Sequence, residues 1–402
     1  METGPIVRAL LHHKTGTFLV ALQIAVSLAI IVNAMFIINA RIEKMNRPTG
    51  MDVANLIAIS IRSTGDDSDG LADIRRDLDF LRYHPDVDQA TVINHFPLSG
   101  SGSGTGLRTL PDENVTPTST ARYQLDEYGL ETLGANLVRG RNFRPEEVQM
   151  RSPGDEPQTA EVVIVTQALG DELFPQQDPL GNVVYWGNME PATIIGIVDH
   201  MQGSWVNWDG LDRNLFHARV SAQNFVRYLV RSRPGRRDAL IPVLESELFK
   251  LNRNRVIREV SAHEDIVARS YELDRAMTNI LIAVIILLVG LTALVITGLA
   301  SYFVSQRTKQ IGIRRALGAT RMDILRYFLV ENWLITTLGA IGGCLLTVGV
   351  GYWLETSFDL PRLDWRYLGA SILVLWVVSQ FAAYWPARRA TNIAPAVATR
   401  SV

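Results

Sequence analysis

Four long apolar segments constrain the fold of this 402-residue chain more than any other feature. They occupy residues 17–39, 278–304, 332–354 and 367–386, and none of them contains a charged side chain. A helix rises 1.5 Å per residue, so about 20 residues cross a hydrocarbon core that is ~30 Å thick. The first segment exceeds the ~7–15 apolar residues of a cleaved signal peptide. The sequence therefore predicts an α-helical membrane protein with four transmembrane helices.

Basic residues between the apolar segments predict the orientation. Residues 305–326 contain six Arg or Lys and a single acid, whereas residues 355–366 contain two Arg and three acids. Short basic flanks stay on the cytoplasmic side of a membrane. We therefore expect a multi-pass protein with cytoplasmic termini (the N-terminal part being 1–39 with the first helix), a cytoplasmic loop at 305–330 and a large domain outside at 40–277. Residues 278–402 then hold the last three helices, the loop and a cytoplasmic tail.

The outer segment has the pattern of a mixed α/β domain. Strand-like runs at 55–61, 87–95, 225–230 and 256–260 are separated by stretches with apolar residues at helical spacing. Two strand–helix–strand units predict a ferredoxin-like split βαβ subdomain made of residues 50–96 and 206–260. Residues 97–205 begin with a Gly/Ser-rich loop and contain strand-like runs at 160–166 and 192–198. We interpret this insertion as a second, β-rich subdomain.

A stalk is predicted at residues 261–277. Ser261 and Glu264 have the spacing of a helix capping box, and no proline interrupts the chain from there to Phe303. One helix of about 40 residues would be about 60 Å long, which is twice the thickness of the hydrocarbon core. The alternative is two helices with a break near Arg275.

Several chemistries are excluded or unsupported by the sequence. It contains no Gly-x₄-Gly-Lys-Ser/Thr phosphate loop, no Gly-x-Ser-x-Gly elbow and no His-Glu-x-x-His motif. The one cysteine, Cys344, lies in an apolar run, and the seven histidines show no spacing typical of metal ligands. A net charge of −2 gives no reason to expect nucleic acid. We therefore expect no catalytic residues, no metal site and no bound cofactor in this chain.

The basic loop shows local structure that is not needed merely to place basic residues on the cytoplasmic side of the membrane. Residues 306–317 predict a short helix whose apolar residues are Ile311, Ile313, Ala316 and Leu317. Gly318 suits a left-handed helix stop, and residues 320–323 suit the capped start of the next helix. A plain basic anchor would explain the charges, but it would not require a sharp turn at one place.

Two glycines in the third apolar segment suggest close helix packing. Gly339 and Gly343 are separated by three residues, the spacing that lets helix backbones approach in a membrane. The pattern fits packing within the chain as well as packing against a second subunit.

The basic loop, "RTKQIGIRRALGATRMDIL" at 307–325, resembles the cytoplasmic loop of MacB/FtsX-type ABC transporter permeases. The resemblance covers nearly the whole chain. It extends through "HFPLSG" at 95–100, "LETLGANLVRGRNF" at 130–143, "VVIVTQALGDELFPQQDPLG" at 162–181, "TIIGIVDHMQG" at 193–203 and "PARRATNIAPAVATR" at 386–400. The sequence departs from the family pattern at Gln310 and Val397, where the family usually has acidic residues.

This resemblance implies the permease subunit of an ATP-driven exporter in a bacterial inner membrane, with a MacB-like periplasmic core domain. The cytoplasmic loop of the family touches the ATPase. By position, that role falls to Arg307, Ile311, Gly312, Arg314, Arg315, Ala316, Leu317, Gly318 and Arg321. Because the chain begins close to its first span, we expect the ATPase, with its ATP and Mg²⁺, on a separate polypeptide that forms a dimer.

Further partners implied by the resemblance are a second permease (the same chain or a paralogue), membrane lipid, a periplasmic adaptor and an outer-membrane channel. ATP binding would move the loop, and the stalk would carry this motion to the periplasmic domain, which expels substrate. Two alternatives share the scaffold. One is an FtsX-like regulator that activates a periplasmic partner such as a cell-wall hydrolase, and the other is a lipoprotein-release permease.

Overall fold

The computed structural model describes residues 14–64, 70–152, 155, 161–187, 189–358 and 365–392. It divides into two compact units, each with its own buried clusters: Met1–Asn46 with Asp274–Val402, and Arg47–Leu273. Residues 393–400 of the C-terminal stretch at 386–400 and residues 359–364 of the loop used to predict orientation lie outside the described residues.

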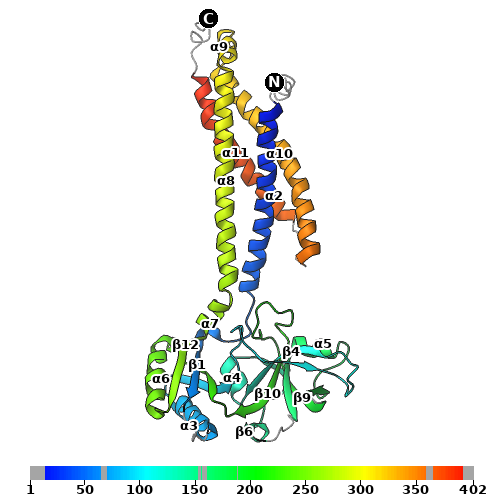
Figure 1. The fold of residues 1–402 in the computed structure, drawn as a ribbon, viewed down its shortest axis with the longest axis vertical. Coiled ribbons are helices and arrows are strands. Elements are labelled where there is room, and N and C mark those ends of the chain that lie inside the picture. The colour runs from blue at the N-terminus through cyan, green and yellow to red at the C-terminus, as the bar shows by residue number, and fades with distance from the viewer. Residues whose placement is uncertain are drawn as a thin grey trace. The chain divides into compact units, whose positions relative to one another are not determined.

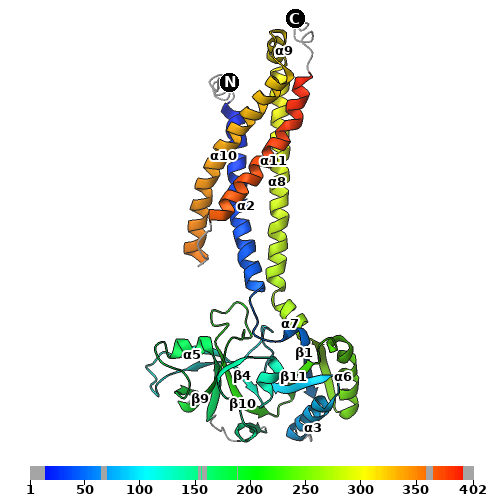
Figure 2. The same ribbon diagram turned by 180° about the vertical axis from the view of Figure 1, so that it is seen from behind.

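Over the described residues, the first unit contains four long helices and one short one. Each long helix is long and apolar enough to cross a membrane, which confirms the predicted membrane fold. Figures 1 and 2 show the long helices running alongside one another. The five helices are α2 (Lys14–Met45), α8 (Glu272–Gln306), α9 (Thr308–Ala316), α10 (Arg321–Phe358) and α11 (Trp365–Thr391).

Helices α2 and α8 are longer than a membrane requires. Helix α8 has 35 residues, so it is about 52 Å long, against a hydrocarbon core of ~30 Å. Near its first turn, buried Asp274 pairs with Arg41 and with Lys44, whose Nζ lies 2.8 Å from Oδ2. Both bases lie in the last turns of α2, so this carboxylate clamps the ends of the two helices together.

Glycines on α10 allow α2 to approach closely. A Cβ atom added at Gly343 would lie 2.8 Å from Leu28 Cδ2 and 3.0 Å from the Ala25 carbonyl oxygen, and one added at Gly339 would lie 2.9 Å from the Ala21 carbonyl oxygen. Contacts below about 3.0 Å force a shift, here against backbone atoms of α2. The Gly339-x₃-Gly343 pair therefore packs within the chain.

Alanine at Gly343 should accordingly destabilise the folded chain by about 1–3 kcal/mol, the usual cost of overpacking. Gly349→Ala is the matched control, because nothing lies within 4 Å of a Cβ at that position. The control should be neutral or slightly stabilising, since a helix prefers alanine to glycine by about 0.5–1 kcal/mol. The midpoint of unfolding in detergent measures both, and equal midpoints for the two variants would contradict the packing described here.

Polar side chains join the other helix pairs. Ser27 on α2 lies 3.1 Å from Thr292 on α8, oxygen to oxygen. On α10, Asn332 Nδ2 donates to Ser379 Oγ of α11 over 2.9 Å, and Thr336 Oγ1 lies 2.5 Å from the same oxygen. All of these groups are buried, so their hydrogen bonds replace the water that they lack in a bilayer.

The second unit contains a four-stranded antiparallel sheet of order β12-β1-β11-β2. Every second side chain along its strands faces two helices. On this face, Ile57, Ile59 and Tyr228 pack against Leu78 and Leu244 of those helices. This is the ferredoxin-like arrangement that the two strand–helix–strand units predicted. The elements are β1 (Leu56–Ser63), α3 (Gly70–Tyr83), β2 (Val87–Ile93), β11 (Phe225–Ser232), α6 (Arg237–Leu251) and β12 (Arg255–Ala262).

The inserted residues form an eight-stranded mixed sheet with the main path β3-β4-β10-β7-β9-β5, to which β6 and β8 add. Its strands are β3 (Gly104–Leu107), β4 (Thr118–Leu125), β5 (Leu137–Gly140), β6 (Gln149–Arg151), β7 (Val162–Thr166), β8 (Val183–Trp186), β9 (Glu190–Val198) and β10 (Asn214–Ser221). The short helical elements of this unit are η1 (Val53–Asn55), α4 (Gly129–Leu133), η2 (Pro145–Glu147) and α5 (Gln167–Leu173).

Strand β10 corrects the predicted end of the insertion. The sequence interpretation placed residues 206–260 in the ferredoxin-like subdomain, but β10 at 214–221 pairs with β4 and β7 of the inserted sheet. It is a central strand there, with Leu215 and Phe216 fully buried. The local sequence of this strand does not say which sheet it joins, so only its pairing assigns it to the inserted sheet.

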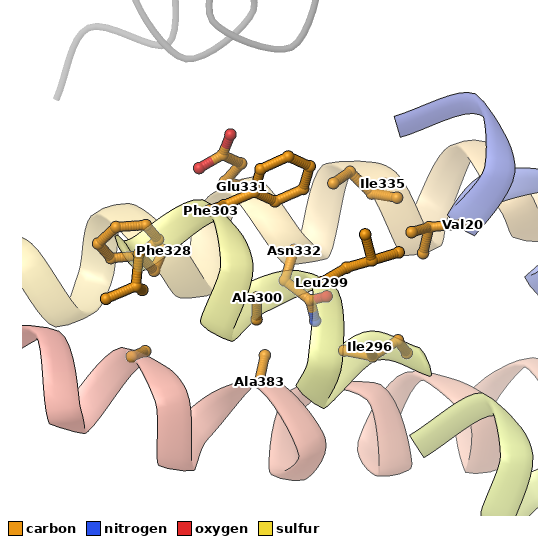
Figure 3. Close-up of a pocket in the computed structure, with 12 residues that line it drawn as sticks. Val20, Ile296, Leu299, Ala300, Phe303, Phe328, Glu331, Asn332, Ile335 and Ala383 are labelled. Atoms are coloured by element: carbon orange, nitrogen blue, oxygen red, sulfur yellow. The ribbon is translucent and has the colours of Figure 1, made fainter. Parts of the chain in front are cut away.

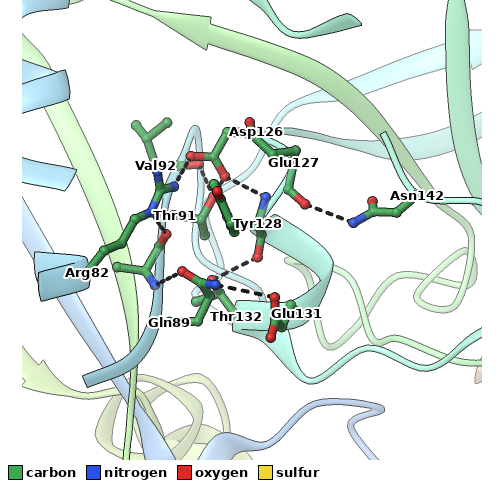
Figure 4. A network of polar contacts seen from close by, with 11 residues as sticks. Arg82, Gln89, Thr91, Val92, Asp126, Glu127, Tyr128, Glu131, Thr132 and Asn142 are labelled. Carbon is green, nitrogen blue, oxygen red and sulfur yellow. Dashed lines mark hydrogen bonds and ion pairs between the residues drawn. The ribbon is translucent and has the colours of Figure 1, made fainter. Parts of the chain in front are cut away.

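A buried carboxylate joins the two sheets of this unit (Figure 4). Asp126, at the end of β4, pairs with Arg82 of α3 and accepts a hydrogen bond of 2.7 Å from Thr91 Oγ1 of β2. The guanidinium of Arg82 also lies 4.1 Å from the ring centroid of Tyr128. Burial raises the pKa of Asp126, and the pairing with Arg82 opposes that shift. The contact ties the insertion to the ferredoxin-like sheet at a defined point.

The predicted stalk helix is not continuous from residue 261. Ser261 and Ala262 belong to β12, and helix α7 (His263–Ser270) ends before α8 begins at Glu272. Ser261 Oγ donates to Glu259 Oε1 rather than capping a helix. Tyr271 is buried and its hydroxyl donates to Gln202 Oε1 over 3.3 Å, so tertiary packing bends the chain at that residue. The break therefore exists, four residues earlier than the alternative near Arg275.

Candidate functional site

The loop between α8 and α10 is a short helix followed by a tight turn. Helix α9 ends at Ala316, and Gly318 has a φ of 101°, a left-handed conformation that side chains with a Cβ rarely adopt. Thr320 Oγ1 accepts from the Asp323 backbone N–H over 3.2 Å, and Asp323 Oδ2 accepts from the Thr320 N–H over 2.9 Å. This reciprocal capping starts α10. The predicted helix, stop and capped restart are confirmed.

One side of the loop is buried against the long helices. Arg307 Nη1 lies 2.9 Å from both carboxylate oxygens of Glu331 on α10, and both side chains are at most 10% exposed. Ile311 packs with Phe328 and Ala390, which belong to α10 and α11. Three of the nine predicted contact residues, Arg307, Ile311 and Gly312, therefore face inward. Their position suits holding the loop in place rather than touching a partner.

The opposite side of the loop is exposed and carries both apolar and basic groups. Leu317 is 83% exposed, and Arg314, Ala316, Gly318 and Arg321 are exposed as well. Arg315 is half-buried, because its Nη1 donates to the Thr391 carbonyl oxygen over 2.6 Å and so ties the loop to the end of α11.

Two exposed residues were missed by the sequence interpretation. Ile313 is 51% exposed and Met322 is 67% exposed, beside Leu317 in the sequence. The spacing could have revealed Ile313: two positions turn a helix by about 200°, so a residue two after inward-facing Ile311 points outward. We call Ile313, Leu317 and Met322, with Arg314 and Arg321, the loop tip.

A small recess lies beside the buried side of the loop, within the first unit (Figure 3). Its volume is about 40 Å³, and it is lined by residues of α8, α10 and α11 together with Val20 of α2. Phe303, Phe328 and Ile335 give it an apolar wall, and Glu331, the partner of Arg307, is at one end. The recess is about the size of one water molecule, so it bears on helix packing and not on ligand binding.

Among the described residues, no group of three or more His, Cys, Asp or Glu side chains is placed to hold a metal ion. The residues of the loop tip offer a surface whose shape and charge a partner can recognise.

The fold and the loop define a multi-pass membrane protein with a periplasmic-type α/β domain inserted after its first helix. Residues 17–241 match the model of the MacB-like periplasmic core domain, and residues 281–395 match that of the FtsX-like permease C-terminal domain. The first match covers more than half of the chain. The chain belongs to the MacB/FtsX family of ABC transporter permeases.

Curated relatives include the macrolide export ATP-binding/permease protein MacB 2 of Aeromonas hydrophila, which is 27% identical over 97% of this chain and 59% of its own length. The corresponding MacB of Neisseria meningitidis is 26% identical over the same shares. This chain thus spans about three-fifths of the length of these relatives. Among solved structures, the periplasmic region of MacB from Actinobacillus actinomycetemcomitans aligns with a TM-score of 0.33 and 16% identity, over 54% of this chain and 92% of its own.

Proposed function

We infer that this chain is the permease part of an ATP-driven exporter in the bacterial inner membrane, with cytoplasmic termini and a periplasmic 47–273 unit. ATP and Mg²⁺ would be bound by a partner ABC ATPase dimer, and this chain would perform no hydrolysis itself. The observation that carries the proposal is the loop tip. An aliphatic side chain that is 83% exposed, set between arginines at a rigid turn, is typical of a protein contact and is not needed for topology.

The loop has the rigidity that such a contact requires. Its inner side is fixed by the Arg307–Glu331 pair and by the bond from Arg315 to the Thr391 carbonyl oxygen, which links it to α10 and α11. A push on the tip would therefore displace long helices rather than deform the loop. Helix α8 runs without interruption from Gln306, at the start of the loop, back to Glu272, where the 47–273 unit ends in the sequence.

Through these connections, ATP binding would move the periplasmic domain and expel substrate. A second permease, identical or paralogous, and a periplasmic adaptor with an outer-membrane channel would complete the machine. The relatives described above are named macrolide export proteins, and export is the part of that activity that we propose for this chain.

Replacing Leu317 with aspartate tests the proposal. The full chain is co-expressed with an ABC ATPase from a neighbouring gene, and the amount of ATPase that co-purifies is measured. We expect at least a tenfold loss, because a charge would be buried in an apolar contact. Leu110→Asp is the control, since Leu110 is an exposed leucine, at 58%, in the other unit.

Equal recovery of the ATPase with the wild type and with Leu317→Asp, at equal membrane insertion, would contradict the proposal. A periplasmic hydrolase that depends on this chain without any export would instead support the FtsX-like alternative. Bound lipoprotein in the purified complex would support the lipoprotein-release alternative.

A further inference from the structure

A separate cleft lies wholly within the 47–273 unit. Its volume is about 690 Å³, within the ~300–1,000 Å³ that small-molecule sites occupy. It is bounded by the face of the ferredoxin-like sheet that turns away from α3 and α6, by the segments 95–101 and 205–207, and by helix α7. Neither the family match nor the loop tip gives this cleft a role.

Strand register places three different polar groups side by side on the floor of the cleft. Ser60 of β1 pairs with Glu259 of β12 on one side and with Arg227 of β11 on the other. All three line the cleft, because residues directly opposite in antiparallel strands point to the same face. The floor is thus an acid, a hydroxyl and a base in a row.

The acid of this row is already neutralised. Glu259 pairs with Arg269 of α7 and accepts a hydrogen bond of 3.0 Å from Ser261 Oγ. The base is not neutralised: over the described residues, no carboxylate oxygen lies within the 4.0 Å of an ion pair from the Arg227 guanidinium. Arg227 Nη1 donates instead to the Asn94 carbonyl oxygen over 2.6 Å, and its guanidinium lies 4.3 Å from the Phe225 ring centroid.

A half-buried cation without a counter-ion is unfavourable, and burial accordingly lowers the pKa of Arg227. His95 borders the same space, and its buried Nδ1 atom has no hydrogen-bond partner in the part of the chain that the structure describes. Burial and the nearby Arg227 and Arg122 lower the pKa of His95, so this ring is neutral at pH 7. The site therefore holds one unpaired positive charge and one unused ring nitrogen.

Part of the cleft lining is apolar, while several serines and an asparagine line the rest. Phe96, Trp205, Phe225 and Ile266 line it, and Trp205 is held by an edge contact with Trp208, ring centroids 5.7 Å apart. A few convergent polar groups at the base of aromatic walls are typical of a site for an amphipathic small molecule.

We propose that this cleft binds a small molecule with an apolar body and a single carboxylate, the carboxylate lying against Arg227 and the apolar part against Trp205. Arginine recognises carboxylate oxygens through paired N–H donors, and its Nε and Nη2 groups remain available for this. A dianionic phosphate fits less well, because Arg269 is already paired with Glu259 and Arg227 is left to balance a single negative charge. The proposal is independent of the ATPase, since binding to the chain alone tests it.

The test uses the full chain in lipid nanodiscs with 4-(trifluoromethyl)phenylacetate as the probe, followed by ¹⁹F NMR titration. Its neutral analogue, 4-(trifluoromethyl)phenethyl alcohol, reports partition into lipid. We expect saturable binding of the acid, at least fivefold weaker binding in Arg227→Gln, and no change in Arg231→Gln. Arg231 lies four residues along the same strand and pairs with exposed Asp88 outside the cleft, so it is the matched control.

Two further variants separate binding from folding. Arg227→Lys keeps the charge and should retain part of the affinity, whereas Trp205→Ala should weaken binding of the acid without changing the lipid partition that the alcohol reports. Equal affinity of wild type and Arg227→Gln, or equal binding of acid and alcohol to the wild type, would overturn the proposal. Thermal midpoints of every variant are measured in the same nanodiscs. Ser60→Ala, which leaves the cation in place, should bind within threefold of wild type, and if Arg227→Gln melts early, the comparison of acid with alcohol on the wild type decides.

Discussion

Replacing Arg307 with methionine should destabilise the membrane unit by about 3–5 kcal/mol, the usual cost of removing one member of a buried ion pair. The remaining Glu331 carboxylate would stay 5% exposed beside Phe328 and Ile335, without the guanidinium that now touches both of its oxygens. We expect a matching fall in the midpoint of detergent-induced unfolding of the full chain and a lower yield of folded protein.

A double-variant cycle separates the lost pair from the lost side chain. Arg307→Met combined with Glu331→Gln also removes the buried carboxylate charge, so it should recover most of the stability. Replacing both members of a buried ion pair often changes the free energy of unfolding very little. Arg314→Met is the control: Arg314 is an exposed cation on the same helix, and its contact is with the Tyr327 ring, 4.8 Å away. Additive losses in the double variant would show that the pair does not hold the loop.

The same pair predicts a functional consequence. If the loop tip contacts an ATPase, the double variant should bind it almost normally, since the tip residues are unchanged. Coupling of hydrolysis to export should nevertheless decline, because the Arg307–Glu331 pair is one of the links from the loop to α10.

Patterns with a single physical cause were readable from the sequence. Four uncharged runs of 20 or more residues have few alternatives to membrane helices, and alternating isoleucines such as Ile57 and Ile59 mark a strand with one face against helices. Gly318 and Thr320 were readable for the same reason, because a left-handed stop and a helix cap need particular residue types.

What escaped the sequence depends on contacts between distant residues. The break at Tyr271 arises because its side chain is buried and bonded to Gln202, and nothing in the local sequence excludes a continuous helix there. The assignment of β10 depends on its pairing with β4 and β7. At the loop, a family resemblance named Arg307 and Leu317 together, yet the first is buried and the second is exposed.

Two buried histidines predict that the 47–273 unit is sensitive to acid. His217 is 1% exposed, and burial, with Arg219 and Arg122 nearby, lowers its pKa to about 3. His263 is fully buried, and burial lowers its pKa to about 4. Among the residues that the structure describes, neither ring has a hydrogen-bond partner for its nitrogens. The unfolded chain binds protons at these rings near pH 6.5, while the folded chain does not. Stability is therefore present above about pH 6.5 and is lost as the pH falls toward the folded-state values.

Between pH 7.5 and pH 5.5, each histidine should contribute a loss of about 1.4 kcal/mol in the free energy of unfolding, or about 3 kcal/mol for both. The window from pH 7.5 to pH 5.5 lies above the ordinary range of carboxylate pKa values. Burial raises the pKa values of Asp77 and Asp126, so their protonation acts in the opposite direction and favours the folded state. Urea unfolding of the full chain at the two pH values, monitored by proteolytic cleavage within the 47–273 unit, measures this loss in the free energy of unfolding.

His217→Phe should remove about half of this pH dependence, because it keeps a ring against Trp186, whose centroid now lies 4.9 Å away, and removes the titrating group. The double variant His217→Phe/His263→Phe should remove most of it. His84→Phe, at the half-buried histidine that directly follows α3, should leave the slope within about 0.5 kcal/mol of wild type. A slope that survives the double variant would place the acid sensitivity elsewhere in the unit. Loss of the slope would show that two uncharged rings in the periplasmic core set the pH below which this domain opens.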